Sequence, residues 1–155
     1  MKIYTSYYAM LDKQPSNLQP IAISRGTYRW NADAQRAPRY WPLAPDKKLH
    51  RYAQIREGDG KPPVDSVYRS IFKRQLETLD PHAVIIQLHD IVDTQWNDPT
   101  QCEGMLLYCF ERPEDGCHRH LVAAWLREHG YYCTELVYSE KQAARYPDHV
   151  QTKLL

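Results

Sequence analysis

Residues 104–138 constrain the fold most, because they predict a strand, a turn, a helix and a second strand in direct succession. Residues 105–110 form an uninterrupted apolar run, which is typical of a strand covered on both faces. A polar turn then leads into Cys117-His118-Arg119-His120 and a helix, and residues 131–138 are rich in strand-forming types. Two strands joined by such a helix run parallel, so the segment predicts a right-handed crossover.

The rest of the chain alternates between strand and helix patterns in the same way. Strands are predicted at residues 2–8 and 18–24, and helices at 46–57, at 64–79 and from Asp80 to about residue 92. Residues 139–155 are predicted to form a polar C-terminal tail. The whole pattern predicts a single α/β domain over residues 1–155, with a mostly parallel central sheet flanked by helices and a C-terminal strand-helix-strand unit.

The charge and hydropathy of the chain narrow the partners we expect. A formal net charge of +1 argues against a broad basic face for nucleic acid or membrane lipid, although it leaves room for a local basic patch. No apolar run approaches the roughly 18 residues that a membrane span needs. The first residues enter a strand pattern without a signal-peptide core. We therefore expect a cytoplasmic protein with no membrane partner.

Four cysteines occur at positions 102, 109, 117 and 133, and a reducing cytoplasm is expected to keep them as thiols rather than as a disulfide framework. Their spacing contains no C-x-x-C pair, so a structural zinc site is not indicated. We predict neither a metal nor a cofactor.

The turn at Cys117 is the candidate site. In open α/β sheets, ligands gather beyond the carboxyl ends of the strands, near helix N-termini. The helix N-terminus favours negative charge and lowers the pKa of a thiol, so Cys117 is a candidate nucleophile. Arg119 offers a forked donor for a phosphate or a carboxylate, and His118 or Glu111 is a candidate proton carrier.

Each of these residues also has a structural interpretation, which the sequence leaves open. Cys117 is then an inert small residue at the start of a helix, and Arg119 pairs with a nearby carboxylate of the turn. A metal site made of Cys117, His118 and His120 is a weaker alternative, because no distant fourth ligand is evident. The phosphatase loop does not fit, since it places its arginine six residues after the cysteine rather than two.

The ends of the first two strands are predicted to complete a pocket for an anion. Ser6 and Tyr7 lie near the end of the first predicted strand, and Ser24 and Arg25 lie at the end of the second. The long aromatic and basic segment 27–45 follows, and its Trp30 is a candidate for stacking on a planar ligand. The alternative for this segment is a surface loop fixed by its own aromatic side chains.

The run Leu106-Leu107-Tyr108-Cys109-Phe110, followed by Cys117-His118-Arg119, resembles the signature of the domain of unknown function 488 family. Similar stretches include residues 2–9, 21–24, 43–45 and 79–81, so the resemblance covers most of the chain. It implies an α/β domain with its site at the Cys-His-Arg turn, and it implies no particular reaction.

Three hypotheses for function follow. The first is a protein that binds or processes a nucleotide or a nucleic-acid-derived anion at the Cys-His-Arg turn. The second is a non-catalytic module that senses a ligand or a partner. The third is a metal-dependent hydrolase built on Cys117 and histidines.

Overall fold

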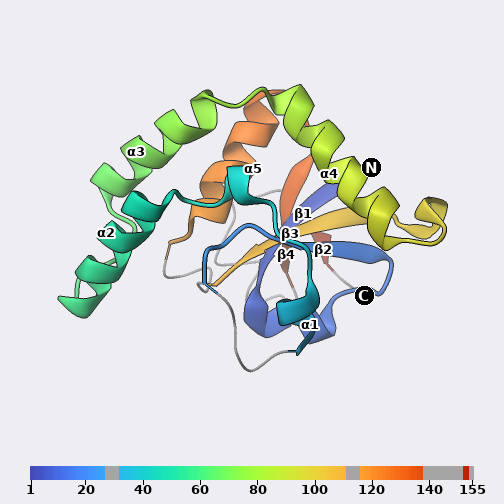
Figure 1. Cartoon of the computed structure of the whole chain (residues 1–155), viewed down its shortest axis with the longest axis horizontal. Coiled ribbons are helices and arrows are strands. Elements are labelled where there is room, and N and C mark those ends of the chain that lie inside the picture. Colours follow the sequence, from blue (N-terminus) through green and yellow to red (C-terminus); the bar gives the residue numbers. More distant parts are fainter. Residues whose placement is uncertain (27–31, 111–115, 138–151, 154–155) are drawn as a thin grey trace.

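The structure is a computed structural model that describes residues 1–26, 32–110, 116–137 and 152–153. Its centre is a parallel sheet of strand order β2-β3-β1-β4-β5 (Figure 1). The strands are β1 (Lys2–Tyr7), β2 (Leu18–Ala22), β3 (Gly104–Cys109), β4 (Cys133–Val137) and β5 (Thr152–Lys153). The predicted α/β class and the C-terminal strand-helix-strand unit are thereby confirmed.

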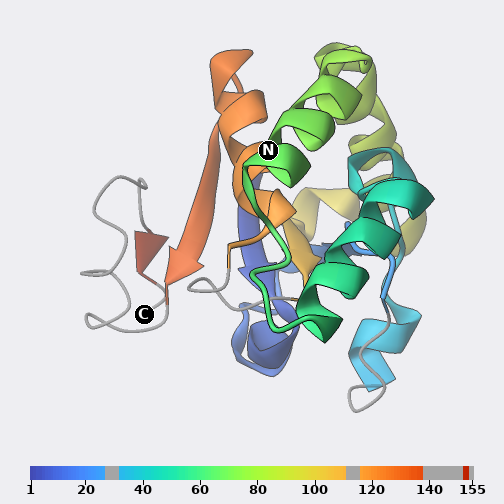
Figure 2. The same ribbon diagram turned by 90° about the vertical axis from the view of Figure 1, so that its left-hand side faces the viewer.

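Helices and short 3-10 turns cover the two faces of the sheet unequally. The α-helices are α1 (Ala32–Arg36), α2 (Lys47–Gly58), α3 (Ser66–Glu77), α4 (Pro81–Gln95) and α5 (His118–Glu128). The 3-10 turns are η1 (Tyr8–Lys13), η2 (Trp41–Leu43) and η3 (Pro99–Gln101). The helices α2 to α5 arch over one side of the sheet, while η1 and α1 lie on the other (Figures 1 and 2).

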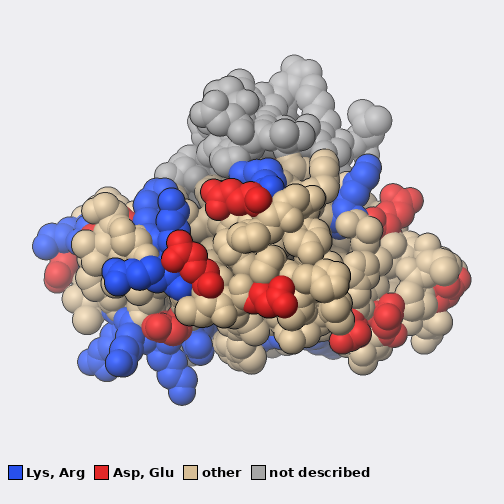
Figure 3. All heavy atoms as spheres, turned by 90° about the horizontal axis from the view of Figure 1, so that it is seen from above, with Lys and Arg blue, Asp and Glu red and all other residues tan. Residues whose placement is uncertain are grey.

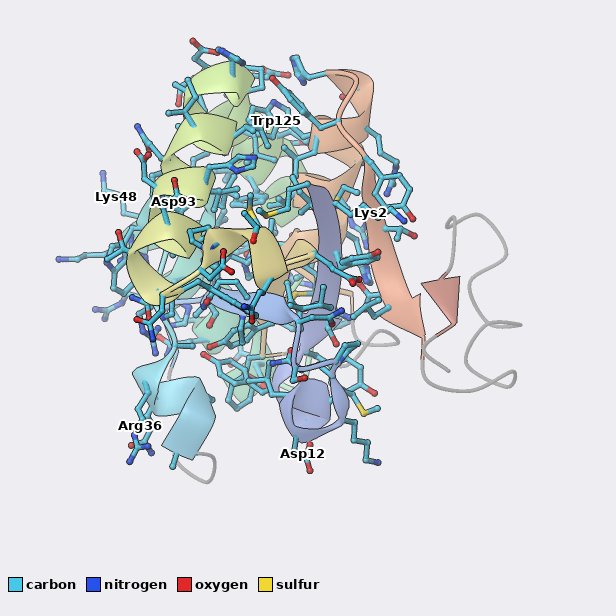
Figure 4. All side chains as sticks on the ribbon, turned by 90° about the vertical axis from the view of Figure 1, so that its right-hand side faces the viewer. Lys2, Asp12, Arg36, Lys48, Asp93 and Trp125 are labelled. Carbon is cyan, nitrogen blue, oxygen red and sulfur yellow. A yellow bond between two sulfur atoms is a disulfide. The ribbon has the colours of Figure 1, made fainter. Side chains whose placement is uncertain are left out.

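Alternation along the strands divides the core into two clusters. Ile3, Met105 and Leu107 face α3, α4 and α5, together with Phe72 and Leu88 from the helices. Trp125 of α5 belongs to this larger cluster and lies inside the helical layer (Figure 4). On the other face, Tyr4, Leu106 and Tyr108 pack with Tyr8 and Leu11 of η1. The two faces follow from the period of two in a strand.

Strand β3 has all six residues buried because it lies between β2 and β1. The prediction that this strand is covered on both faces is confirmed. The last strand, β5, pairs with β4 inside the segment predicted as a tail, and the rest of that segment lies outside the described residues.

Aspartates begin three of the α-helices. Asp46, Asp65 and Asp80 each accept a hydrogen bond from a backbone N–H of the first turn of α2, α3 or α4. Such N-caps stabilise a helix by about 1 kcal/mol each. Among the helices that the structure describes, none is both long enough and apolar enough to cross a bilayer.

The substitution Gly104→Ala tests the packing at the start of β3. A Cβ at this position would lie 2.8 Å from the carbonyl oxygen of Lys2 and 3.1 Å from side-chain atoms of Leu18 and Tyr4. We expect a loss of about 1–3 kcal/mol in the free energy of unfolding. Gly58→Ala is the matched control, because nothing lies within 4 Å of its added Cβ. Urea denaturation measures both variants, and equal stabilities would contradict the packing.

Candidate site at the carboxyl edge of the sheet

The carboxyl ends of β1, β2 and β3 meet the N-terminus of α5 at one edge of the sheet. Strand β1 leads into η1 on one face, whereas β3 leads into α5 on the other, so the chain leaves these neighbouring strands in opposite directions. This is the arrangement at which open α/β sheets bind ligands. Two groups of side chains occupy this edge, an ion-pair centre at β1 and β4 and a cavity next to β2.

Arg119 is the centre of the first group and is fully buried. Its Nε and Nη2 donate to the carboxylate of Glu135 over 2.9–3.2 Å, and its Nη1 lies 3.1 Å from the Sγ of Cys109. Its guanidinium also lies 5.5 Å from the ring centre of Tyr7. The structure therefore places Arg119, predicted as an anion-binding residue, in a bidentate ion pair with the protein's own carboxylate.

Glu135 completes this centre from β4. Thr5 donates its hydroxyl to Glu135 over 2.5 Å, and the Nε2 of His120 lies 3.8 Å from the carboxylate. Burial alone would raise the pKa of Glu135, but the charge and hydrogen bonds of Arg119, together with the nearby His120, outweigh it and lower that pKa to about 2. Glu135 is therefore ionised at neutral pH and neutralises Arg119.

The structure joins Cys109 and Cys117 in a disulfide, whereas Cys102 and Cys133 are free. The prediction that all four cysteines are thiols is wrong for this pair. The sulfurs meet because Cys109 ends β3 and Cys117 is the residue just before α5. As a nucleophile, Cys117 requires that this bond first be reduced. Cys117 is only 3% exposed, and it is not part of the lining of the cavity beside β2.

His118 connects the ion-pair centre with the cavity. Its Nε2 lies 2.5 Å from the carbonyl oxygen of Ile23, which can only accept, so Nε2 carries the proton. The unprotonated Nδ1 faces the Sγ of Cys117 at 3.6 Å. Burial, with Arg119 nearby, lowers the pKa of His118 to about 4, so the imidazole is neutral at pH 7.

The ligand atoms of Cys109, Cys117 and His118 lie within 4.8 Å of one another, a grouping that can hold a metal ion in the reduced protein. In the disulfide form the two sulfurs are bonded to each other. The guanidinium of Arg119 beside Cys109 also places a positive charge next to this group, which disfavours a cation.

A cavity of about 210 Å³ lies beside β2, bounded by α2, α3 and the start of α5. Its polar lining includes Ser24, Arg25, His50 and His118. Its apolar lining includes Ala53, Val64, Tyr68 and Phe110. A cavity with apolar walls and a few converging polar groups is the usual form of a small-molecule site.

Arg25 is anchored in the wall of this cavity through its Nε atom. Its Nε donates to the carbonyl oxygen of Pro45 over 2.5 Å, and its guanidinium lies 5.3 Å from the ring centre of Trp41. In the described part of the chain, no residue accepts a hydrogen bond from its two Nη groups. Burial, followed by the charge of Arg25, lowers the pKa of His50 on the facing helix.

The predicted site residues thus separate into four sets. Ser24, Arg25 and His118 line the cavity, while Tyr7, Cys117 and Arg119 belong to the ion-pair centre beside it. Ser6 is fully buried in β1. Trp30 and Glu111 lie outside the described residues.

Sequence reasoning missed Glu135 and His50. Glu135 is the one acidic residue in the otherwise uncharged segment 131–138, which is a signal that it has a buried partner. His50 lies in a stretch of the chain that is rich in Lys and Arg. This local positive charge was the sequence feature that could have marked it as part of an anion site. No comparable signal pointed to the disulfide, because the pairing depends on which strand and helix ends meet.

Comparison with protein families places the chain within one of them. Residues 13–130 match a family model described as DUF488-N3a, the active DUF488-N3 subclade. This match confirms the resemblance seen in the sequence. Searches of curated proteins and of solved structures found no match.

The ion-pair centre predicts that Glu135→Gln greatly lowers the stability of the folded protein. The substitution leaves Arg119 buried without a counter-ion, which costs about 3–5 kcal/mol. Thr134→Val is the matched control on the same strand, because the buried hydroxyl of Thr134 has no hydrogen-bond partner among the described residues. Thermal unfolding followed by circular dichroism measures both variants, and equal melting temperatures would contradict a stabilising ion pair.

The wild-type protein should also lose stability in acid. The depressed pKa of Glu135 contributes stability that is present above the carboxyl's unfolded pKa of about 4.3 and is lost as the pH falls towards 2. Glu135→Gln should show a smaller loss over the same range, because it lacks the group that titrates.

The disulfide predicts a specific thiol count. In the unfolded, unreduced protein, two thiols should react with Ellman's reagent, those of Cys102 and Cys133. Four should react after reduction with a phosphine. Four thiols without reduction would show that the bond does not persist in solution.

Proposed function

Because the chain belongs to the DUF488 family, and the subclade it matches is described as active, we propose that it binds a nucleotide or a nucleic-acid-derived anion in the cytoplasm. The ligand occupies the cavity between β2, α2 and the first turn of α5. The observation that supports this most is the pairing of Arg25 with aromatic walls. Its Nη groups face an anion, and Tyr68 and Phe110 offer surfaces for a planar base.

The volume of the cavity is enough to enclose one compact unit of a ligand, but not a large ligand as a whole. Pockets for whole drug-sized ligands span roughly 300–1,000 Å³. At about 210 Å³, this cavity suits a base or a sugar-phosphate unit, with any remainder extending outside. The neutral His118 supplies a polar contact without adding a charge to the cavity wall.

Processing of the bound ligand by Cys117 is a second candidate, favoured by the lone pair of His118 that faces its sulfur. Cytoplasmic reductants would break the Cys109–Cys117 bond by thiol-disulfide exchange, and His118 would then accept the proton of Cys117. Loss of turnover in Cys117→Ser with unchanged ligand affinity would favour processing. Absence of turnover in the reduced wild type would favour a non-catalytic module.

The cavity predicts that Arg25→Ala weakens the binding of AMP. Loss of hydrogen bonds to a charged group costs about 1.5–3 kcal/mol, which is a decrease of roughly ten- to a hundredfold in affinity. Isothermal titration calorimetry measures the affinity, and Arg25→Lys should recover part of it by restoring the charge.

Lys2→Ala is the control, because it removes one positive charge at the opposite, N-terminal end of β1. Its affinity should equal that of the wild type. If Arg25→Ala retained full affinity for AMP while remaining folded, the cavity would not be the ligand site.

A further inference from the structure

The charges of this protein are segregated along the chain, although they nearly cancel in total. Residues 25–74 contain 12 Lys and Arg against 5 Asp and Glu, whereas residues 75–118 contain 1 against 9. Figure 3 shows the result: Lys and Arg gather at the end made by α2 and α3, and acidic side chains prevail towards the other end. One end of the molecule therefore attracts polyanions, and the other repels them.

The basic end includes an open groove that continues the cavity. The groove has a volume of about 390 Å³ and is lined by Arg25, Lys47, His50, Arg51, Gln54 and Ile55. Three of these residues, Arg25, His50 and Gln54, also line the cavity. Lys47 and Arg51 lie one turn apart on α2, so their charges point to the same side. In Figure 4, Arg36 of α1 and Lys48 of α2 both project towards the left of the view.

An exposed tryptophan lies beside the groove. Trp41 is 48% exposed although it is a large aromatic side chain. The guanidinium groups of Arg25 and Arg39 lie 5.3 and 5.6 Å from its ring centre. Aromatic rings combined with cationic side chains are the elements with which proteins hold single strands, since bases stack and phosphates pair.

We propose that the groove and Trp41 bind single-stranded nucleic acid, with one nucleotide in the cavity and the adjoining phosphates along α2. This inference rests on the proposed function, because it places the nucleotide in the same cavity. A single strand fits better than a duplex, since a base that is paired and stacked cannot enter a small cavity. An acidic peptide or an anionic membrane would match the charge, but neither supplies the planar groups that Trp41, Tyr68 and Phe110 accommodate.

Fluorescence anisotropy with a fluorescein-labelled twelve-nucleotide oligothymidylate tests the proposal, using the whole 155-residue chain. The affinity should fall as the salt concentration rises, with a slope of about 0.7 in log K for each neutralised phosphate. The double variant Lys47→Ala/Arg51→Ala should reduce that slope by about 1.4. Trp41→Ala should weaken binding by roughly five- to 150-fold through the loss of a stacked base.

The double variant Lys2→Ala/Lys13→Ala is the matched control, because it removes two exposed charges outside the basic segment. Its affinity and salt slope should equal those of the wild type. An equal effect of both double variants would show that only net charge matters and would overturn the proposed surface. Circular dichroism confirms that each variant is folded before its binding is compared.

The remaining outcomes separate this inference from the proposed function. Binding of AMP without binding of the oligonucleotide would overturn the strand surface and leave the proposed function standing. Binding of the oligonucleotide by a protein that does not bind AMP would overturn the placement of a nucleotide in the cavity. Equal affinity for a duplex of the same length, or binding to phosphatidylserine vesicles alone, would overturn the choice of a single strand.

Discussion

The buried ion pair between Arg119 and Glu135 holds the carboxyl edge of the sheet together. Its two side chains are 0% and 3% exposed, so each loses its hydration and depends on the other. Arg119 comes from the first turn of α5 and Glu135 from β4, while Thr5 of β1 donates to the same carboxylate. One interaction therefore fixes the helix that follows β3 against two other strands.

Because Arg119 is paired with Glu135, this arginine is a poor binding group for an external ligand. An arginine that is satisfied by its own carboxylate has little capacity left for an external anion. The groups that line a cavity are on the far side of β3, where Arg25 follows β2 and His50 faces it from α2. His118 lies between the two regions, because its two ring nitrogens contact Ile23 on the cavity side and Cys117 on the other. The Cys-His-Arg turn thus supports the proposed ligand site, and its His118 forms part of the cavity wall.

Local sequence patterns predicted most of the helices and strands. They could not predict which strands lie side by side in the sheet. The apolar run of β3 and the period of α5 identified both elements, and Asp80-Pro81 marked the start of α4. On α3, the helical period alone would also allow Val67 and Ile71 to face inwards. Both are exposed, because the buried stripe is the narrower one of Tyr68, Phe72 and Leu76. The partner of Arg119 required the knowledge that β4 lies beside β1, and parallel pairing between distant segments leaves no local signal.

The most direct test of this account is the position of a bound nucleotide on the protein. In a titration of ¹⁵N-labelled protein with AMP, we expect the largest chemical-shift changes at the backbone amides of Ser24, Arg25, His50 and Ala53, which surround the cavity. The amides of Thr134 and Glu135 on β4 should change little. The largest changes at β4, or no changes at saturating AMP, would contradict the assignment of the ligand site to the cavity beside β2.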